Sequence, residues 1–471
     1  NQTVMGVTLG FEPATLAAGY IIGIEVGMSL LTGIVIGWLV ILPGCFLVLG
    51  VPDSGTAYDM VMDMWSTHLR FVGVGVMFVG GIWTLIRLTK PVIDGLRYSS
   101  ASSRKTINLK KETAILRTEQ DISMRWVVSG VVFFGALALL LVAYFLQTEQ
   151  VAVGSLLYFS VLFLTVLIIL AMGFVLSTVC GYFTGLIGSS NNPLSGILII
   201  AVILVGVVFI CLFGHQLEMY KKEVTAFLVL VVSVIATSAS ISNENIQDLK
   251  AGHMIGATPW KQQLILMLGV VVSAFILAPI LELLFQAYGM GGVFPHKGMP
   301  TSQMLPAPQA GLIGAVAQGV ITQHLPWNTI GIGFVIAVLL IGVDEYLKPK
   351  GKRLPVLAVG LGIYLPMEVL MPVVLGSVVS YLVSRKRERK YGLKMIAKSH
   401  GHDSVLLACG VVAGAALMGV ILAVPFVLMG GSDALRVMPA SLDPLAGVLG
   451  VLAMLALCWW LYRTAVKQFD G

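Results

Sequence analysis

Charged side chains are scarce in this chain: Asp, Glu, Lys and Arg make up 11% of its 471 residues, whereas soluble domains carry about 25%. Hydrophobic residues make up 57%, and the mean hydropathy is +0.94. So few charges exclude a set of ordinary soluble domains. Apolar runs of about 18 residues or more recur along the chain, and each is long enough to cross a bilayer. The composition therefore predicts one all-α polytopic membrane protein.

Cysteine is also rare, with five scattered residues and no CxxC pair, which suggests neither a disulfide framework nor a thiolate metal site. Walker A, GxSxG and HExxH motifs are absent, so nothing indicates an enzyme. The seven histidines are dispersed, and only His400 and His402 are close in sequence. A basic face with aromatic readers, as nucleic-acid binding requires, is missing too. We predict no enzyme activity, no resident metal or cofactor, and no nucleic-acid partner.

The most unusual stretch is Gly181–Gly196, which reads GYFTGLIGSSNNPLSG and separates two uncharged apolar runs, 151–179 and 197–213. Glycine and proline disfavour helices, and serine and asparagine compete for backbone hydrogen bonds. Irregular backbone at membrane depth survives only where it is buried in protein or lines a wet cavity, and transporters place substrate sites at such broken helices. We expect a broken helix at a substrate site; the alternative is a polar surface loop.

The placement of lysine and arginine sets the predicted orientation. If the basic linker 87–125 faces the cytoplasm, all but five of the 29 Lys and Arg lie on that side when the spans are counted along the chain. This bias requires 354–383 to enter and leave the membrane on the cytoplasmic side, as a hairpin. The net charge of +6 then reflects contact with anionic lipid. The five external exceptions are Arg70, Lys221, Lys222, Lys297 and Arg436.

Two apolar stretches share one spacing. Gly19–Gly33 reads GYIIGIEVGMSLLTG and Gly362–Gly376 reads GIYLPMEVLMPVVLG, so both fit G-x5-E-x7-G, with Glu25 matching Glu368. In the predicted topology the first hairpin begins and ends outside and the second inside, which is typical of inverted-repeat secondary transporters. Because much more chain precedes the second hairpin than the first, we expect this chain to be the C-terminal part of a longer protein.

We divide the chain into the end of a first repeat, residues 1–146, and a second repeat, residues 151–471, with about 12 membrane segments in total. Broken helices and re-entrant segments are expected in both. The first part holds hairpin 7–50, span 69–88, linker 87–125 and span 126–146; the second holds the broken-helix motif 181–196, a cytoplasmic motif 243–263, an external loop 289–309, a re-entrant segment 310–322 and hairpin 354–383.

Three long motifs, GLIGSSNNPLSG, NENIQDLKAGHMIGATPWKQQ and GVGVMFVGGIWTLIRL, resemble the oligopeptide transporter (OPT) family, especially its prokaryotic members. The late hairpin GIYLPMEVLMPVVLG is similar to that family as well. A related branch, the yellow-stripe-like transporters, carries metal–chelator complexes. The resemblance implies about sixteen membrane segments in two inverted halves. It also implies proton-coupled import of small peptides or chelated metals, and the motifs do not distinguish between the two.

Acidic residues inside apolar stretches are the candidates for proton coupling: Glu25, Glu368 and Glu282. An ionisable group at membrane depth costs at least a few kcal/mol and is therefore a functional candidate. The alternative for Glu25 and Glu368 is a structural hydrogen bond to backbone freed at a hairpin tip, and for Glu282 it is helix packing. We expect Asp344 and Glu345, at a cytoplasmic helix end, to be solvated.

Uncharged polar groups supply the predicted substrate site. Asn191, Asn192 and Ser195 offer amides and a hydroxyl to a peptide backbone or to chelator carboxylates. Pro193 suits the first turn of a helix, whose N-terminus favours an anionic substrate. Three tyrosines are expected to line the same cavity, with ordinary packing as the alternative: Tyr20, Tyr182 and Tyr364.

The polar motif 243–263 is expected to contain an amphipathic helix, Glu244–Lys250, which ends at Gly252 on the cytoplasmic side. Asp248 and Lys250 are its candidate gate residues, because paired charges there would break and form as the carrier opens. The alternative is a solvated connector anchored by Trp260.

These observations predict a secondary active importer in the plasma (inner) membrane of a prokaryotic cell, driven by a proton gradient. Its substrate is a small peptide or a metal chelate, and its other partner is membrane lipid; homo-oligomerisation is left open. The alternative from another class is an uncoupled channel or facilitator for small polar solutes, which would not saturate or respond to a pH gradient.

Overall fold

The computed structural model is helical throughout the part of the chain that it describes, apart from one isolated bridge between Met290 and Leu305. In that part, ten helices are long and apolar enough to cross a membrane, and two shorter apolar helices cover Pro13–Ile22 and Gln309–Thr322. The described residues are 10–50, 57–84, 86–87, 116–149, 154–187, 194–290, 304–305, 307–323, 326–391, 402–430, 435, 438–439 and 442–467.

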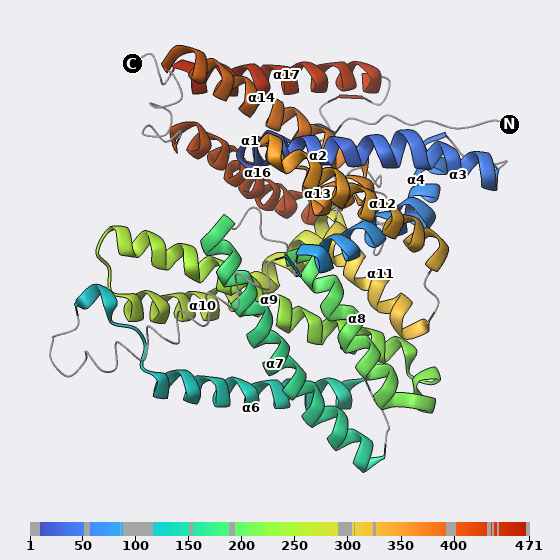
Figure 1. Ribbon diagram of the computed structural model, residues 1–471, viewed down its shortest axis with the longest axis vertical. Coiled ribbons are helices and arrows are strands. Elements are labelled where there is room, and N and C mark those ends of the chain that lie inside the picture. The colour runs from blue at the N-terminus through green and yellow to red at the C-terminus, as the bar shows by residue number, and fades with distance from the viewer. Residues whose placement is uncertain are drawn as a thin grey trace. The chain divides into compact units, whose positions relative to one another are not determined.

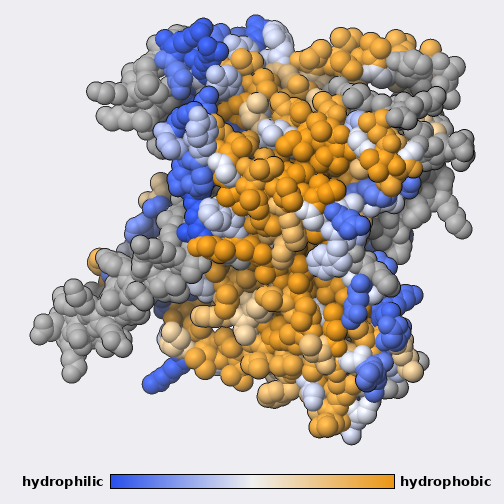
Figure 2. Space-filling model, turned by 45° about the vertical axis from the view of Figure 1, so that its right-hand side comes forward, coloured by the Kyte–Doolittle hydropathy of each residue, from blue (hydrophilic) through white to orange (hydrophobic). Residues whose placement is uncertain are grey.

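The described surface exposes more apolar side chains than a soluble protein does. Figure 2 shows hydrophobic residues over much of the visible face. Trp126 on α6 (Met124–Thr148) is 74% exposed and Phe275 on α10 (Pro259–Tyr288) is 79% exposed. Soluble monomers rarely expose contiguous apolar patches larger than a few hundred Å². These side chains therefore face lipid, as the composition predicts.

The chain forms two compact units. Unit 1 comprises residues 1–80, 279–308 and 326–471, and unit 2 comprises residues 81–278 and 309–325. Helix α10 is divided between them at Pro279, a proline within the helix.

Unit 1 is built around two broken helices. In the first, α1 (Pro13–Ile22) and α2 (Ile24–Ile34) are separated by Gly23, whose φ of +86° favours glycine. In the second, α13 (Val356–Tyr364) and α14 (Met367–Tyr391) are separated by Leu365 and Pro366. Leu365 is extended, with ψ of 152°, as expected of a residue before proline.

The two broken helices cross each other reciprocally. α1 packs along α14 and α2 along α13, so that in Figure 1 the blue ribbons of α1 and α2 lie against the orange ribbons of α13 and α14. Each contact depends on glycine. A Cβ atom at Gly19 would lie 2.8 Å from the Cα atom of Val373, and one at Gly33 would lie 2.7 Å from the Cα atom of Gly362. Gly376 packs in the same way against Leu16 and Tyr20.

The segments predicted as hairpins, 7–50 and 354–383, hold these two broken helices, and their entry and exit on one side of the membrane stays a prediction. Within each segment the two helices pack mainly against the other segment instead of folding back on each other. The physical reason is the glycine faces, which allow a closer approach to the other segment. After α2, the chain continues helically through the π-helix η1 (Val35–Ile41) and α3 (Leu42–Leu49).

The remaining helices of unit 1 surround this crossing. Residues 57–84 are helical throughout: α4 (Ala57–Met64), the π-helix η2 (Trp65–Leu69) and a run from 70 to 84. That run packs on α12 (Trp327–Leu347) through the Phe78 and Phe334 rings, whose centroids lie 5.7 Å apart. α16 (His402–Met429) packs on α1, and α17 (Asp443–Lys467) packs on α14.

Unit 2 is organised around α7 (Ser155–Ile187) and α9 (Lys221–Met254), which lie along each other (Figure 1). α6 packs on α7, and α8 (Leu194–Phe213) packs on both α7 and α9. α11 (Pro308–Thr322) contributes Val320 to the same core, opposite Gly206. The stacked rings of Phe209 and Phe227, 4.9 Å apart, join α8 to α9.

Two predicted motifs of unit 2 lie at the ends of long helices. α7 remains helical through residues 181–187, so the start of the predicted break is helix, and residues 188–193 lie outside the described residues. Residues 244–250 are helical as expected, and they form the last turns of α9, which is unbroken from Lys221 to Met254. Thr184 donates a 2.6 Å hydrogen bond to Oδ1 of Asn243, which lets polar residues continue α9 against α7.

Candidate functional site

Glu25 and Glu368 occupy the same place in the two broken helices. Each is the second residue of the helix that follows the break, Glu25 in α2 and Glu368 in α14. Glu25 is exposed, and no described side chain donates a hydrogen bond to its carboxylate. Glu368 is half-buried, and Oε2 accepts a 3.4 Å hydrogen bond from the Tyr58 hydroxyl. The backbone places the two acids alike, but their surroundings differ.

A cationic and aromatic cluster lies beside the second break. Arg70 donates from Nε and Nη2 to the Tyr364 hydroxyl, at 2.9 and 2.7 Å. Its guanidinium carbon lies 5.1 Å from the centroid of the Tyr364 ring and 5.8 Å from that of the Trp65 ring, both cation–π distances. Trp65 Nε1 donates to the backbone oxygen of Tyr364 at 3.1 Å. Tyr364 ends α13, four residues before Glu368.

Two π-helices supply the tryptophans of this cluster. Trp38 lies in η1 and Trp65 in η2, and their rings stack with centroids 6.4 Å apart. Trp38 is 1% exposed, and its Nε1 has no hydrogen-bond partner in the described part of the chain. π-helical turns are rare and frequently occur at functional sites. We call Trp38, Trp65, Arg70 and Tyr364 the Arg70 cluster.

The predicted substrate residues fall in different places. Of the tyrosines, Tyr364 belongs to the Arg70 cluster, Tyr20 is 4% exposed and hydrogen-bonded to Ser404, and Tyr182 is half-buried in α7 of unit 2. Asn191, Asn192 and the side chain of Ser195 lie outside the described residues.

Glu282 lies on an exposed part of α10. Its Oε1 accepts a 2.8 Å hydrogen bond from Gln286, one turn further along the same helix. The described interactions of Glu282 are therefore local to its helix, unlike those of Glu368.

The predicted gate residues do not pair with each other. Asp248 and Lys250 are both exposed on α9, two residues apart, and such positions do not face each other on a helix. The backbone oxygen of Asp248 accepts a 3.0 Å hydrogen bond from Gln262 Nε2, which ties the end of α9 to the start of α10. Their role as a gate stays a prediction.

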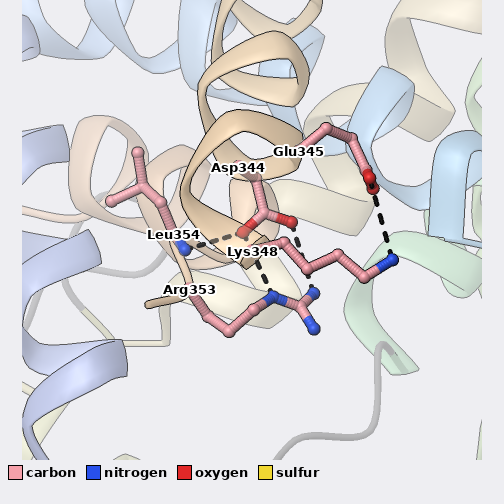
Figure 3. Close-up of polar contacts among 5 residues, drawn as sticks. All are labelled: Asp344, Glu345, Lys348, Arg353 and Leu354. Atoms are coloured by element: carbon pink, nitrogen blue, oxygen red, sulfur yellow. Dashed lines mark hydrogen bonds and ion pairs between the residues drawn. The ribbon is translucent and has the colours of Figure 1, made fainter. Parts of the chain in front are cut away.

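Asp344 is not solvated, contrary to expectation. It is 5% exposed, and its carboxylate accepts two 3.3 Å hydrogen bonds from Arg353 and a 2.7 Å bond from the backbone N–H of Leu354 (Figure 3). These contacts fix the turn that leads into α13. Glu345, one residue on, has 40% of its side chain exposed and pairs with Lys348 at 3.7 Å.

The Arg70 cluster was missed from sequence, where Arg70 counted only as an exception in the charge bias. One signal was available: Arg70 follows the polar segment that holds Asp59 and Asp63, directly precedes the apolar run 71–84, and lies five residues after an aromatic residue, Trp65. Among the described residues, no group of three or more His, Cys, Asp or Glu side chains is arranged to hold a metal ion.

The long apolar helices indicate a multi-pass membrane protein. Its helices are broken or π-helical beside Glu25, Glu368 and Arg70, as is typical of transporters. The family model for OPT oligopeptide transporter proteins matches residues 2–426. The chain is also 36% identical over 456 residues, 94% of its length and 70% of the relative's, to a Haemophilus influenzae protein named "Putative oligopeptide transporter". The chain therefore belongs to the OPT oligopeptide transporter family, a family of multi-pass transporters and not of enzymes.

Proposed function

We propose that this transporter imports small peptides across the plasma membrane of a prokaryotic cell and that protons drive the import. The observation that carries the proposal is the matched position of Glu25 and Glu368, each one residue inside a helix that follows a break. A carboxyl group held within apolar helices can take up a proton at one side of the membrane and release it at the other.

The reciprocal crossing of α1–α2 with α13–α14 supports an inverted-repeat mechanism. Exchanging the two broken helices maps the contact of α1 with α14 onto that of α13 with α2, and the Gly19–Gly376 region onto the Gly33–Gly362 region. Such internal symmetry underlies alternating access in many secondary transporters. In this scheme, protonation of Glu25 or Glu368 favours the loaded, inward-moving state, and deprotonation inside resets the carrier.

The test is uptake into proteoliposomes that contain the full-length protein, with an imposed inward proton gradient. The panel holds labelled tri- to hexapeptides beside ferric chelates. We expect saturable peptide uptake that collapses when a protonophore removes the gradient. Gradient-driven uptake of the chelates alone would contradict the peptide assignment. Unsaturable flux without a gradient would contradict the carrier and indicate a channel.

A further inference from the structure

Arg70 is a half-buried charge of unit 1 for which the described residues supply no acid. Residues 57–84 form one helical stretch, and in it Arg70 directly precedes the apolar run 71–84. Burying a charge is costly unless it is paired and hydrogen-bonded. No described carboxylate forms an ion pair with it, and its Nη1 has no hydrogen-bond partner among the described residues.

Arg353 shows how the same unit treats an arginine that serves structure. Its fork meets both oxygens of the buried Asp344 carboxylate, so that the charge is compensated within the protein (Figure 3). Arg70 instead donates twice to one neutral phenol, the Tyr364 hydroxyl. A phenol orients the guanidinium but does not neutralise it. The cluster thus holds an oriented, half-buried cation for which the described residues supply no anion.

The surroundings of Arg70 suit a recognition site. The Trp65 and Tyr364 rings hold the guanidinium plane by cation–π contacts, which reduces the entropy lost when it binds a ligand. The unused Nη1 leaves donors for a planar acceptor, and carboxylates bind such forks in bidentate fashion. The buried Trp38 Nε1 is a second polar atom of this cluster for which the described residues supply no hydrogen-bond partner.

We propose that Arg70 binds the C-terminal carboxylate of the transported peptide. The inference rests on peptide being the substrate, as proposed above, but not on the coupling ion. A peptide has one terminal carboxylate whatever its side chains, so a single arginine would serve peptides of many sequences. Tyr364 and Trp65 act as positioning residues that hold the fork ready.

The first test needs no variant. Labelled trialanine is bound at equilibrium to the purified full-length protein in detergent, where no membrane potential acts on ligand charge. Unlabelled trialanine and its C-terminal amide then compete. We expect the amide to bind roughly tenfold to a hundredfold more weakly, as for the loss of hydrogen bonds to a charged group. Equal competition by acid and amide would overturn the proposal.

A third competitor separates the terminus from any carboxylate. An amidated tripeptide that carries one glutamate side chain should bind as weakly as the plain amide. If it competes as well as free trialanine, the assignment to the C-terminus is wrong.

Arg70→Gln and Arg70→Lys test the residue itself. We expect Arg70→Gln to abolish the preference for acid over amide while binding of the amide stays within about twofold. Arg70→Lys should keep part of the preference, since it retains charge but not the planar fork. Arg463→Gln is the matched control, because Arg463 also lies over a tryptophan, Trp459, at 4.9 Å, and the preference should persist there.

A purely structural Arg70 gives a different pattern. Arg70→Gln would then weaken acid and amide binding equally, together with a lower melting temperature, and the proposal would fail. Uptake in proteoliposomes shows whether a failure concerns the role of Arg70 or the proposed proton-driven import. If uptake follows the proton gradient but acid and amide bind equally, only the role of Arg70 in binding the C-terminal carboxylate is wrong. If the acid binds better but uptake does not depend on the gradient, only the proton coupling is wrong.

Discussion

The two broken helices of unit 1 share a backbone plan but not a chemical environment. Both place a glutamate at the second residue after the break, and both depend on glycine where they cross. Only the second is bordered by the Arg70 cluster, and only its glutamate is half-buried with a tyrosine as donor. The same backbone arrangement therefore carries two different sets of side chains. The second break has a cation beside it, and the first does not among the described residues.

Removing the charge of Glu368 should have the largest effect. We expect Glu368→Gln to reduce gradient-driven peptide uptake in proteoliposomes to background, because a neutral amide cannot exchange a proton. Glu25→Gln should cause a smaller loss, since that carboxylate is exposed and has no described donor. Melting temperatures of both variants serve as the control for folding. Wild-type uptake by Glu368→Gln would remove this residue from proton coupling, and equal losses would show that the acids act as a pair.

The shared crossing should fail when a methyl group is added to it. Gly19→Ala places Cβ 2.8 Å from Val373 Cα and still closer to backbone atoms of the same residue, so the helices must separate. We expect about 1–3 kcal/mol of destabilisation, the usual cost of overpacking. Thermal unfolding in detergent measures it. Gly44→Ala is the control, because a Cβ atom at that position would meet nothing within 4 Å and its φ is not positive. Equal stability of both variants would contradict close packing at Gly19.

The anchoring of α13 gives a third contrast, between neighbouring acids. Asp344→Ala leaves the Leu354 N–H and the Arg353 fork without their acceptor, and we expect a loss of about 1–3 kcal/mol. Glu345→Ala removes a long, exposed pair and should cost under about 0.5 kcal/mol. Denaturation of the two variants side by side is the measurement. A larger loss for Glu345→Ala would mean that the turn into α13 is held differently.

The sequence predicted what depends on hydrophobicity and spacing. An all-helical membrane protein follows from the apolar runs, and the equivalent placement of Glu25 and Glu368 was visible as G-x5-E-x7-G. Family membership was also within reach, because its motifs are long. These features are local in sequence, so pattern reasoning reaches them.

The sequence pattern did not predict which residues distant in the chain contact each other in the fold. Whether a polar residue is solvated or bonded depends on the element opposite: Asp344 is buried because Arg353 and Leu354 return to it, and Asn243 continues α9 because Thr184 lies beside it. The partners of the two predicted hairpin segments were out of reach for the same reason, since small residues indicate a close approach but not which helix makes it. Arg70 was classed by its sign alone, because Tyr364, which accepts both of its hydrogen bonds, lies 294 residues away in sequence.

The smallest expected effect on transport concerns Tyr58, the donor that distinguishes Glu368 from Glu25. Its O–H···O distance of 3.4 Å is long for a hydroxyl donor, and Tyr58 is 37% exposed, so the bond is weak in this state. We expect Tyr58→Phe to change the KM for peptide uptake by less than about fivefold, equivalent to under about 1 kcal/mol. Uptake kinetics at fixed proton gradient measure the change. A loss as large as that of Glu368→Gln would contradict this ranking, because it would require the tyrosine to close on the carboxylate during transport and to share its function.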